Sequence, residues 1–335
     1  MILVIGDLHI KDKDPTLYTT FIAKVEQWLR TDRYSTVILL GDIQHKFSHV
    51  DRAAQTLVCT LFSMITKYVD LYVLVGNHDY DNATQFLTEN HTLMPFKSWN
   101  RISIIDKPTV NILTTKEGKD IKVLMVPYVP KGRFNEAIQD IELDKIKVIF
   151  AHQEFQGTKM GPYPSEDGDV WSDNLPIVIS GHAHGRHKVG SNIYHVGMPY
   201  DDSWEETEKR YILELDVKKS NINMTFIPTR MPRKILLRLT YNEALEWKLP
   251  SEEQDMYKLK VICTNEEWKQ FCKLRKKELK GISILHVTTE SKQLDSALQK
   301  RRLEGGNCDS YEEIFHNLVQ KESDLVQSFY KELQG

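Results

Sequence analysis

The chain has 335 residues, of which 41% are hydrophobic and 27% are charged, and its net charge is −3 at pH 7. This composition excludes a disordered or fibrous protein, and the length predicts two domains, or one large domain with an appendage. The weak negative charge gives no support to a nucleic-acid partner, which would need local basic patches or bound metal ions.

The first 200 residues repeat one local pattern: a short β-branched, aliphatic run ends in Gly or Ala, and polar residues follow at once. Such runs predict buried strands. Apolar residues at helical spacing predict helices over 18–29 and 51–69. The alternation of strands and helices predicts an α/β fold with helices on the sheet faces. In such folds the functional side chains lie beyond the carboxyl ends of the strands. The runs are ILVIGDLH (2–9), TVILLGDIQH (36–45), LYVLVGNHD (71–79), KVIFAHQEF (147–155) and PIVISGHAH (176–184).

The rest of the chain predicts further strands over 119–130 and 193–227, as a second sheet or an extension of the first. The segment PTRMP interrupts the pattern, and after it we expect a small α/β unit in the order strand, loop, strand, helix, strand. The predicted domains are 1–230, the α/β unit 231–290, a polar linker 291–308 that contains two glycines, and a helical segment 309–335.

The strand ends carry carboxylate, amide and imidazole groups that suit divalent ions such as Mn²⁺, Fe²⁺ or Zn²⁺. They exceed what one tetrahedral ion needs, so two ions that share a bridging carboxylate fit better. Such a pair of ions clamps a phosphate and activates a water. We expect Mn²⁺, with Mg²⁺, Fe²⁺ and Zn²⁺ as alternatives. The predicted metal ligands are Asp7, His9, Asp42, Asn77, His152, His182 and His184.

The order D-x-H, G-D, G-N-H-D, H and G-H-x-H over residues 1–200 resembles that of the calcineurin-like metallophosphoesterases. The resemblance implies an α/β fold in which a two-layer β-sandwich is flanked by helices. It also implies the metal ligands: Asp7, His9, Asp42 and His184 for one ion, and Asp42, Asn77, His152 and His182 for the other, with Asp42 as the bridge.

The same resemblance implies roles for two residues beside the ligands. His78 would face the phosphate, stabilise the transition state and help to protonate the leaving oxygen. Asp79 would orient His78, as a carboxylate beside an imidazole fixes its tautomer.

Within the family, GDIQHKF and GNHD differ from the GDxVDRG and GNHE of protein serine/threonine phosphatases. His45, three residues after Asp42, resembles the histidine with which SbcD-type double-strand-break-repair nucleases handle the substrate phosphate. GMPYDDSWEET (197–207) resembles that branch's turn, although Met198 replaces a small polar residue. The α/β unit resembles its DNA-capping domain, and 309–335 its docking arm for an SbcC-type coiled-coil ATPase.

We therefore expect a Mn²⁺-dependent DNA exonuclease and endonuclease, the catalytic subunit of an SbcC–SbcD-like repair or recombination complex. One alternative is a small-molecule or cyclic-nucleotide phosphodiesterase, which would have no use for residues 233–335. The other is a non-catalytic scaffold that binds DNA or a partner, and it would have no reason to keep all the ligands.

Basic clusters are candidate DNA contacts, although exposed lysines and arginines are often only solvated. The candidates are Lys131, Arg133, Arg186, Lys188, Lys276 and Lys277.

Segment 50–69 has more apolar residues than one buried helix face requires. We therefore expect a homodimer through this helix and 82–94. The alternative is a helix that is buried on two sides within the monomer. The apolar stripe of 309–335 predicts a partner groove, or packing on its own domain. No apolar run is long enough to cross a membrane, and from the residues after Met1 we expect no signal peptide. We expect the protein to be located in the cytoplasm, which is the host cytoplasm if a phage encodes it, or in the nucleus if it is eukaryotic.

Overall fold

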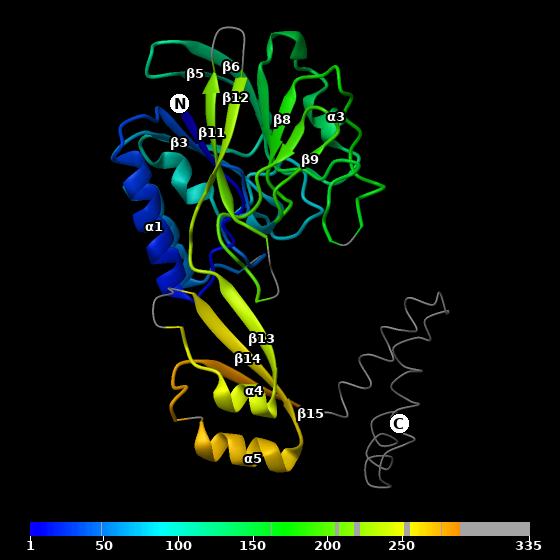
Figure 1. Ribbon diagram of the computed structural model, residues 1–335. Helices are drawn as coiled ribbons and strands as arrows, with labels where there is room; N and C mark the ends of the chain where they lie inside the picture. Colours follow the sequence, from blue (N-terminus) through cyan, green and yellow to red (C-terminus); the bar gives the residue numbers. More distant parts are fainter. Residues whose placement is uncertain are drawn as a thin grey trace. The chain divides into compact units, whose positions relative to one another are not determined.

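The computed structural model describes residues 1–47, 49–161, 163–204, 208–217, 222–250, 255–275 and 277–288 (Figure 1). The chain divides into two compact units, Met1–Ile235 with Glu253–Met256, and Leu236–Glu252 with Tyr257–Gly335. The predicted linker 291–308 and helical segment 309–335 lie outside the described residues. Within the described ranges, no helix has the length and apolar character that a membrane span requires.

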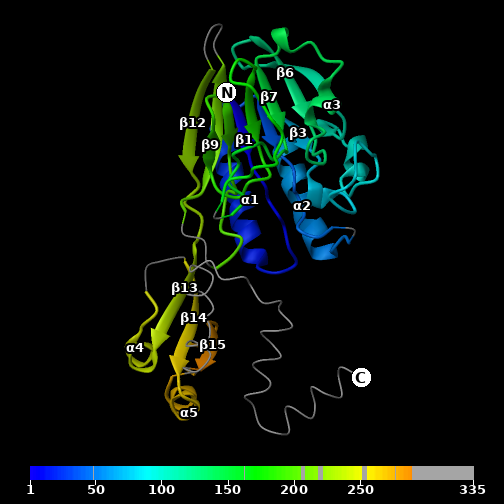
Figure 2. The same ribbon diagram turned by 90° about the vertical axis from the view of Figure 1, so that its right-hand side faces the viewer.

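The first unit contains two six-stranded mixed sheets (Figures 1 and 2). The first sheet has the order β12-β11-β1-β2-β3-β4, with β1 (Ile2–Ile5), β2 (Thr36–Leu39), β3 (Asp70–Leu74), β4 (Ile102–Ile105), β11 (Tyr211–Val217) and β12 (Ile222–Pro228). The second has the order β5-β6-β7-β8-β10-β9, with β5 (Thr109–Thr114), β6 (Asp120–Val126), β7 (Val148–Ala151), β8 (Ile177–Ser180), β9 (His187–Val189) and β10 (Ile193–His195). Strands β1 to β4 are parallel, and so are β6 to β8.

The alternation of side chains along each strand sets the layers. In β1, Ile2 and Val4 point into the core between the sheets, whereas Leu3 and Ile5 pack against the helices. Helices α1 (Pro15–Leu29) and α2 (Arg52–Thr66) cover the outer face of the first sheet, and α3 (Phe134–Ile138) packs on the second. The predicted two-sheet sandwich flanked by helices is confirmed. Short 3₁₀ turns lie at Asn77–Asp79, Met94–Ser98 and Leu143–Lys145.

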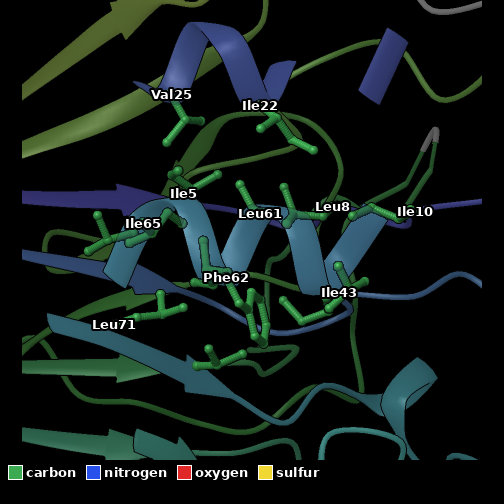
Figure 3. Close-up of a cluster of buried hydrophobic side chains, with 14 of the residues drawn as sticks. Ile5, Leu8, Ile10, Ile22, Val25, Ile43, Leu61, Phe62, Ile65 and Leu71 are labelled. Atoms are coloured by element: carbon green, nitrogen blue, oxygen red, sulfur yellow. The ribbon is translucent and has the colours of Figure 1, made fainter. Parts of the chain in front are cut away.

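Helix α2 uses its apolar surplus inside the monomer. Leu61 and Phe62 are fully buried and Met64 is 6% exposed. Figure 3 shows Leu61 and Phe62 among residues of the first sheet and its loops, with α1 close by. Leu61, Phe62 and Met64 are therefore not available to a second copy, whereas Val50, just before the helix, is 45% exposed. The oligomeric state itself stays a prediction.

The second unit is built on a three-stranded sheet of β13 (Lys234–Thr240), β14 (Met256–Cys263) and β15 (Ser283–Thr288). Helix α4 (Tyr241–Glu246) stands where the sequence predicted a loop. A capping box explains it, because the Thr240 side chain accepts from the Glu243 N–H and the Glu243 carboxylate accepts from Thr240. Helix α5 (Asn265–Leu274) ends before Lys277, one of the candidate DNA contacts.

Candidate metal centre

The predicted ligands follow strands from both sheets. Asp7 and His9 follow β1, Asp42 follows β2, and Asn77 follows β3. From the second sheet, His152 follows β7, and His182 and His184 follow β8. Because β1, β2 and β3 are parallel to one another, and β7 is parallel to β8, the carboxyl ends of each set lie at the same edge.

Three of these residues hold an unusual backbone conformation. His9, Asp42 and His182 have φ angles of 43°, 48° and 71°, in the left-handed region that side chains with a Cβ rarely occupy. Such strain, when the surrounding structure enforces it, tends to gather at functional sites.

Two glycines admit the carboxylates. A Cβ on Gly76 would lie 2.2 Å from Oδ1 of Asp42, and one on Gly181 would lie 2.4 Å from Oδ1 of Asp7. Only glycine allows these approaches, which accounts for the glycine before Asn77 and before His182.

The side chains converge in two adjacent groups. In the first, single ligand atoms of Asp7, His9 and His184 lie within 4.8 Å of one another. The Nε2 atoms of His9 and His184 are 3.1 Å apart, and His9 Nε2 is 3.4 Å from Asp42 Oδ2. Asp42 therefore adjoins this group.

The second group contains Asp42, His152 and His182, with ligand atoms again within 4.8 Å. His182 Nδ1 lies 3.3 Å from His152 Nε2, and His152 Nε2 lies 3.4 Å from Asp42 Oδ2. The amide oxygen of Asn77 is 3.0 Å from His152 Nε2 and 2.8 Å from His182 Nδ1. Asp42 thus lies between the two groups, where a bridging carboxylate would have to be.

The donor set fits divalent cations. Imidazole nitrogens face one another, and among the described residues the buried Oδ2 of Asp7 has no hydrogen-bond partner. Burial raises the pKa of Asp7 to about 7 and lowers the pKa of His9 to about 3. Burial would also lower the pKa of His152, but the adjacent Asp42 carboxylate raises it to about 9. Bound cations would give these buried carboxylate oxygens and imidazole nitrogens a positively charged partner.

His78 belongs to neither of these two groups, but single ring nitrogens of His9, His45 and His78 also lie within 4.8 Å of one another. Its Nδ1 is 2.6 Å from the carbonyl oxygen of His45, which can only accept, so Nδ1 carries the proton when the ring is neutral and Nε2 is left for a substrate. Its backbone N–H donates to Asp42 Oδ1 at 2.8 Å. The ring stacks on Phe47 at 4.1 Å between centroids and on His45 at 5.7 Å. His45 and Phe47 therefore hold the imidazole from one loop.

Asp79 has a different place from the one that the resemblance implies. Its buried carboxylate accepts from the backbone N–H groups of Gly76 at 2.9 Å, Ile43 at 3.0 Å and Gln44 at 3.3 Å. These partners flank Asn77 and Asp42. The expected orientation of His78 by Asp79 is therefore corrected: Asp79 ties together two loops that carry ligands, and the His45 carbonyl orients His78.

Sequence reasoning missed Glu154. Its Oε2 lies 3.8 Å from Nε2 of His182, on the opposite side of the ring from Asn77. The nearby His182 imidazole holds the pKa of Glu154 down to about 2. A carboxylate behind an imidazole ligand orients the ring and strengthens it as a donor. The only signal in the sequence is the two-residue spacing from His152, which is too common to be informative.

Most of the predicted DNA-contacting residues have partners within the chain. Two of them form ion pairs: Lys131 with Glu154 and Asp167, and Arg133 with Glu136. Three lie over aromatic rings: Arg133 over Phe86, Arg186 over Tyr211 and Phe226, and Lys188 over Tyr194. Lys277 is exposed in the second unit, and Lys276 lies outside the described residues.

A basic depression of about 530 Å³ adjoins His45. Its charged and titratable lining comes from the loops after β1 and β2: Lys11, Asp12, Lys13, His45, Lys46, His49 and Asp51. None of its lysines was among the predicted contacts, because single lysines in loops carry no periodic signal.

A two-sheet sandwich that gathers imidazole and carboxylate side chains in two adjacent groups is the architecture of a metal-dependent phosphoester hydrolase. The chain belongs to the calcineurin-like phosphoesterase family, whose family model matches residues 1–209. It is accordingly a phosphoester hydrolase that uses divalent metal ions, and the two groups provide candidate ligands for them.

Two viral proteins are similar in sequence. "Putative phosphoesterase 078R" of Invertebrate iridescent virus 3 is 31% identical over 265 residues, which is 78% of this chain and 75% of that protein. "Putative phosphoesterase 244L" of Invertebrate iridescent virus 6 is 36% identical over 217 residues, or 64% and 75% of the two chains. Among solved structures, Plasmodium GAP50, described as the anchor in the inner membrane complex, has a TM-score of 0.46 and 14% identity, covering 70% of this chain and 86% of that one.

Proposed function

We propose that this chain is a Mn²⁺-dependent DNA nuclease, the catalytic subunit of an SbcC–SbcD-like complex. The observation that carries the proposal is the basic depression beside His45, whose carbonyl oxygen lies 2.6 Å from Nδ1 of His78. A polynucleotide has phosphates on both sides of the bond that is cut, and lysines beside the cutting site would hold a neighbouring phosphate. A nucleotide monomer has no such second phosphodiester to place there.

The residues divide the work by position. Asp7, His9, Asp42 and His184 would hold one ion, and Asp42, Asn77, His152 and His182 the other. Bound ions would supply positive charge against the phosphate and a nucleophile at neutral pH. The His45 carbonyl holds Nδ1 of His78, so Nε2 is the atom through which His78 would help to protonate the leaving 3′ oxygen. His45 borders the depression and contributes its ring to the phosphate side.

Several further parts belong to the same proposal. The second unit would cap the DNA, and segment 309–335, outside the described residues, would dock the coiled-coil ATPase. A homodimer would present two sites to one DNA end. The protein would act in the cytoplasm, or in the nucleus of a eukaryotic host.

The test compares a polymer with a small diester under Mn²⁺. We expect Lys13→Glu and Lys46→Glu to lower cleavage of linear duplex DNA about tenfold, while hydrolysis of bis(p-nitrophenyl) phosphate stays within about twofold. The matched control is Lys67→Glu, an exposed lysine at the other end of α2, about 20 Å along the helix from Ala54, which lines the depression. It should change neither activity.

The outcomes separate the candidate functions. Equal losses on both substrates would remove the polymer argument. Hydrolysis of cyclic or monomeric nucleotide diesters without DNA cleavage would make the chain a small-molecule phosphodiesterase, and no hydrolysis by metal-loaded protein would make it a scaffold. On the nuclease reading, His45→Ala weakens exonuclease activity more than cleavage of single-stranded circles, and equal loss on both would count against the SbcD-like branch.

A further inference from the structure

Two histidines outside the ligand set form a stacked pair beside the metal centre. His187 of β9 and His195 of β10 are direct partners across antiparallel strands. Their rings stack with centroids 4.6 Å apart and an angle of 18° between the planes. His195 is fully buried and His187 is half-buried. Neither lies in a metal-binding motif.

The hydrogen bonds of the pair determine both tautomers. His187 Nε2 is 3.0 Å from the backbone N–H of Lys159, which can only donate, so Nε2 accepts and the proton lies on Nδ1. His195 Nδ1 is 3.0 Å from the carbonyl oxygen of Gly181, which can only accept, so here too Nδ1 donates. His195 Nε2 then accepts from the Thr158 hydroxyl at 2.9 Å.

The neutral state of both rings agrees with their surroundings. Burial lowers the pKa of His195 to about 3, and burial also lowers the pKa of His187. Protonation of either ring would replace an acceptor by a donor and set it against the Lys159 N–H or the Thr158 hydroxyl.

The two Nδ1–H groups donate hydrogen bonds to backbone carbonyls at the two ends of one loop. His195 Nδ1–H binds the carbonyl of Gly181, and His187 Nδ1–H binds the carbonyl of Gly185 at 2.8 Å. Between these glycines lie His182 and His184, and His182 has a φ of 71°. On the other side, the acceptor nitrogens are bound to 158–159, in the segment that follows His152. The pair therefore joins two loops that carry candidate ligands.

We propose that His187 and His195 are positioning residues, a stacked pair of neutral imidazoles that fixes both ends of the loop 181–185 so that His182 and His184 are held in the geometry that binds cations. The pair acts through backbone carbonyls and touches no substrate. The proposal concerns metal binding and does not depend on whether the substrate is DNA.

The experiment measures Mn²⁺ binding by calorimetry on the full chain, with urea unfolding of the metal-free protein beside it. We expect His195→Phe, which keeps a ring for the stack but loses both hydrogen bonds, to weaken Mn²⁺ affinity about 10- to 100-fold, the usual loss when a group that orients ligands is removed. His195→Gln, which can both donate and accept, should recover most of the affinity. His187→Phe should show a loss in the same direction.

The matched control is His91→Phe. His91 is also buried in the first unit, where its Nε2 lies 3.3 Å from Asp106 and its ring packs against Tyr80. Among the described residues, these partners lie outside both loops. It should lower stability without changing Mn²⁺ affinity. A second readout needs no metal: ¹⁵N spectra of the metal-free protein should show the Nδ1–H tautomer for both His187 and His195.

Unchanged Mn²⁺ affinity in folded His195→Phe and His187→Phe overturns the proposal, as does an Nε2–H tautomer for either ring. Should His195→Phe fail to fold, His195→Gln and His187→Phe decide: near-normal affinity in the first with a clear loss in the second supports the pair, and normal affinity in both refutes it. Because the proposal concerns Mn²⁺ binding, neither the presence nor the absence of DNA cleavage by the wild type counts for or against it.

Discussion

The carboxylate of Asp79 offers the sharpest test of how the site is built. It is fully buried and accepts three backbone N–H groups from the loops that carry Asp42 and Asn77. Asp79→Ala leaves these donors without an acceptor. Each buried, unsatisfied donor costs about 1–3 kcal/mol. Because the cavity left by the side chain admits water to some of them, we expect a loss of about 3–6 kcal/mol in the free energy of unfolding.

Such a loss is a large part of the ~5–15 kcal/mol that holds a typical protein folded, so a milder variant is needed beside it. Asp79→Asn keeps one oxygen, turns an amide NH₂ toward a backbone donor, and removes a buried charge near Asp42. We expect a cost of about 1–3 kcal/mol. Urea unfolding of the metal-free protein measures both variants, and calorimetry with Mn²⁺ should show weakened binding for Asp79→Asn.

The opposite pattern would refute this reasoning. If Asp79→Asn unfolds at the wild-type urea concentration, binds Mn²⁺ normally and loses only turnover, the carboxylate acts on His78 in the way that the family resemblance implied. A cost of less than about 1 kcal/mol for Asp79→Ala would also mean that the three hydrogen bonds are replaced by water at little expense.

Three further predictions concern single side chains. Gly181→Ala places a Cβ 2.4 Å from Asp7 Oδ1 and should lower Mn²⁺ affinity more than tenfold by calorimetry; normal affinity would mean that the loop shifts freely. Glu154→Gln removes the negative charge behind His182 and should weaken Mn²⁺ binding about tenfold while the urea midpoint hardly moves; a large stability loss with normal binding would contradict this. Asp51→Ala removes the cap whose carboxylate accepts from two backbone N–H groups of α2, and should cost about 1 kcal/mol in urea unfolding with Mn²⁺ affinity unchanged.

The sequence by itself determined the parts of this protein that depend on local pattern. Buried parallel strands are continuous apolar runs, and a glycine followed by Asp42, Asn77 or His182 marks where such a run must end. Because parallel strands present their carboxyl ends at one edge, these runs were enough to predict that the candidate ligands lie together. The two-sheet sandwich was predicted from the family resemblance of the motifs.

Tertiary structure alone decided which residues support that site. His195, His187 and Glu154 are ordinary residues in their own segments. They matter only because β9, β10 and the loop 181–185 meet the segment that follows His152. Asp79 faces backbone N–H groups from another loop, and no local pattern records such partners. The number of apolar residues in α2 likewise indicates how much of its surface must be buried. Whether the sheet, α1 or a second copy buries that surface depends on packing across the whole unit.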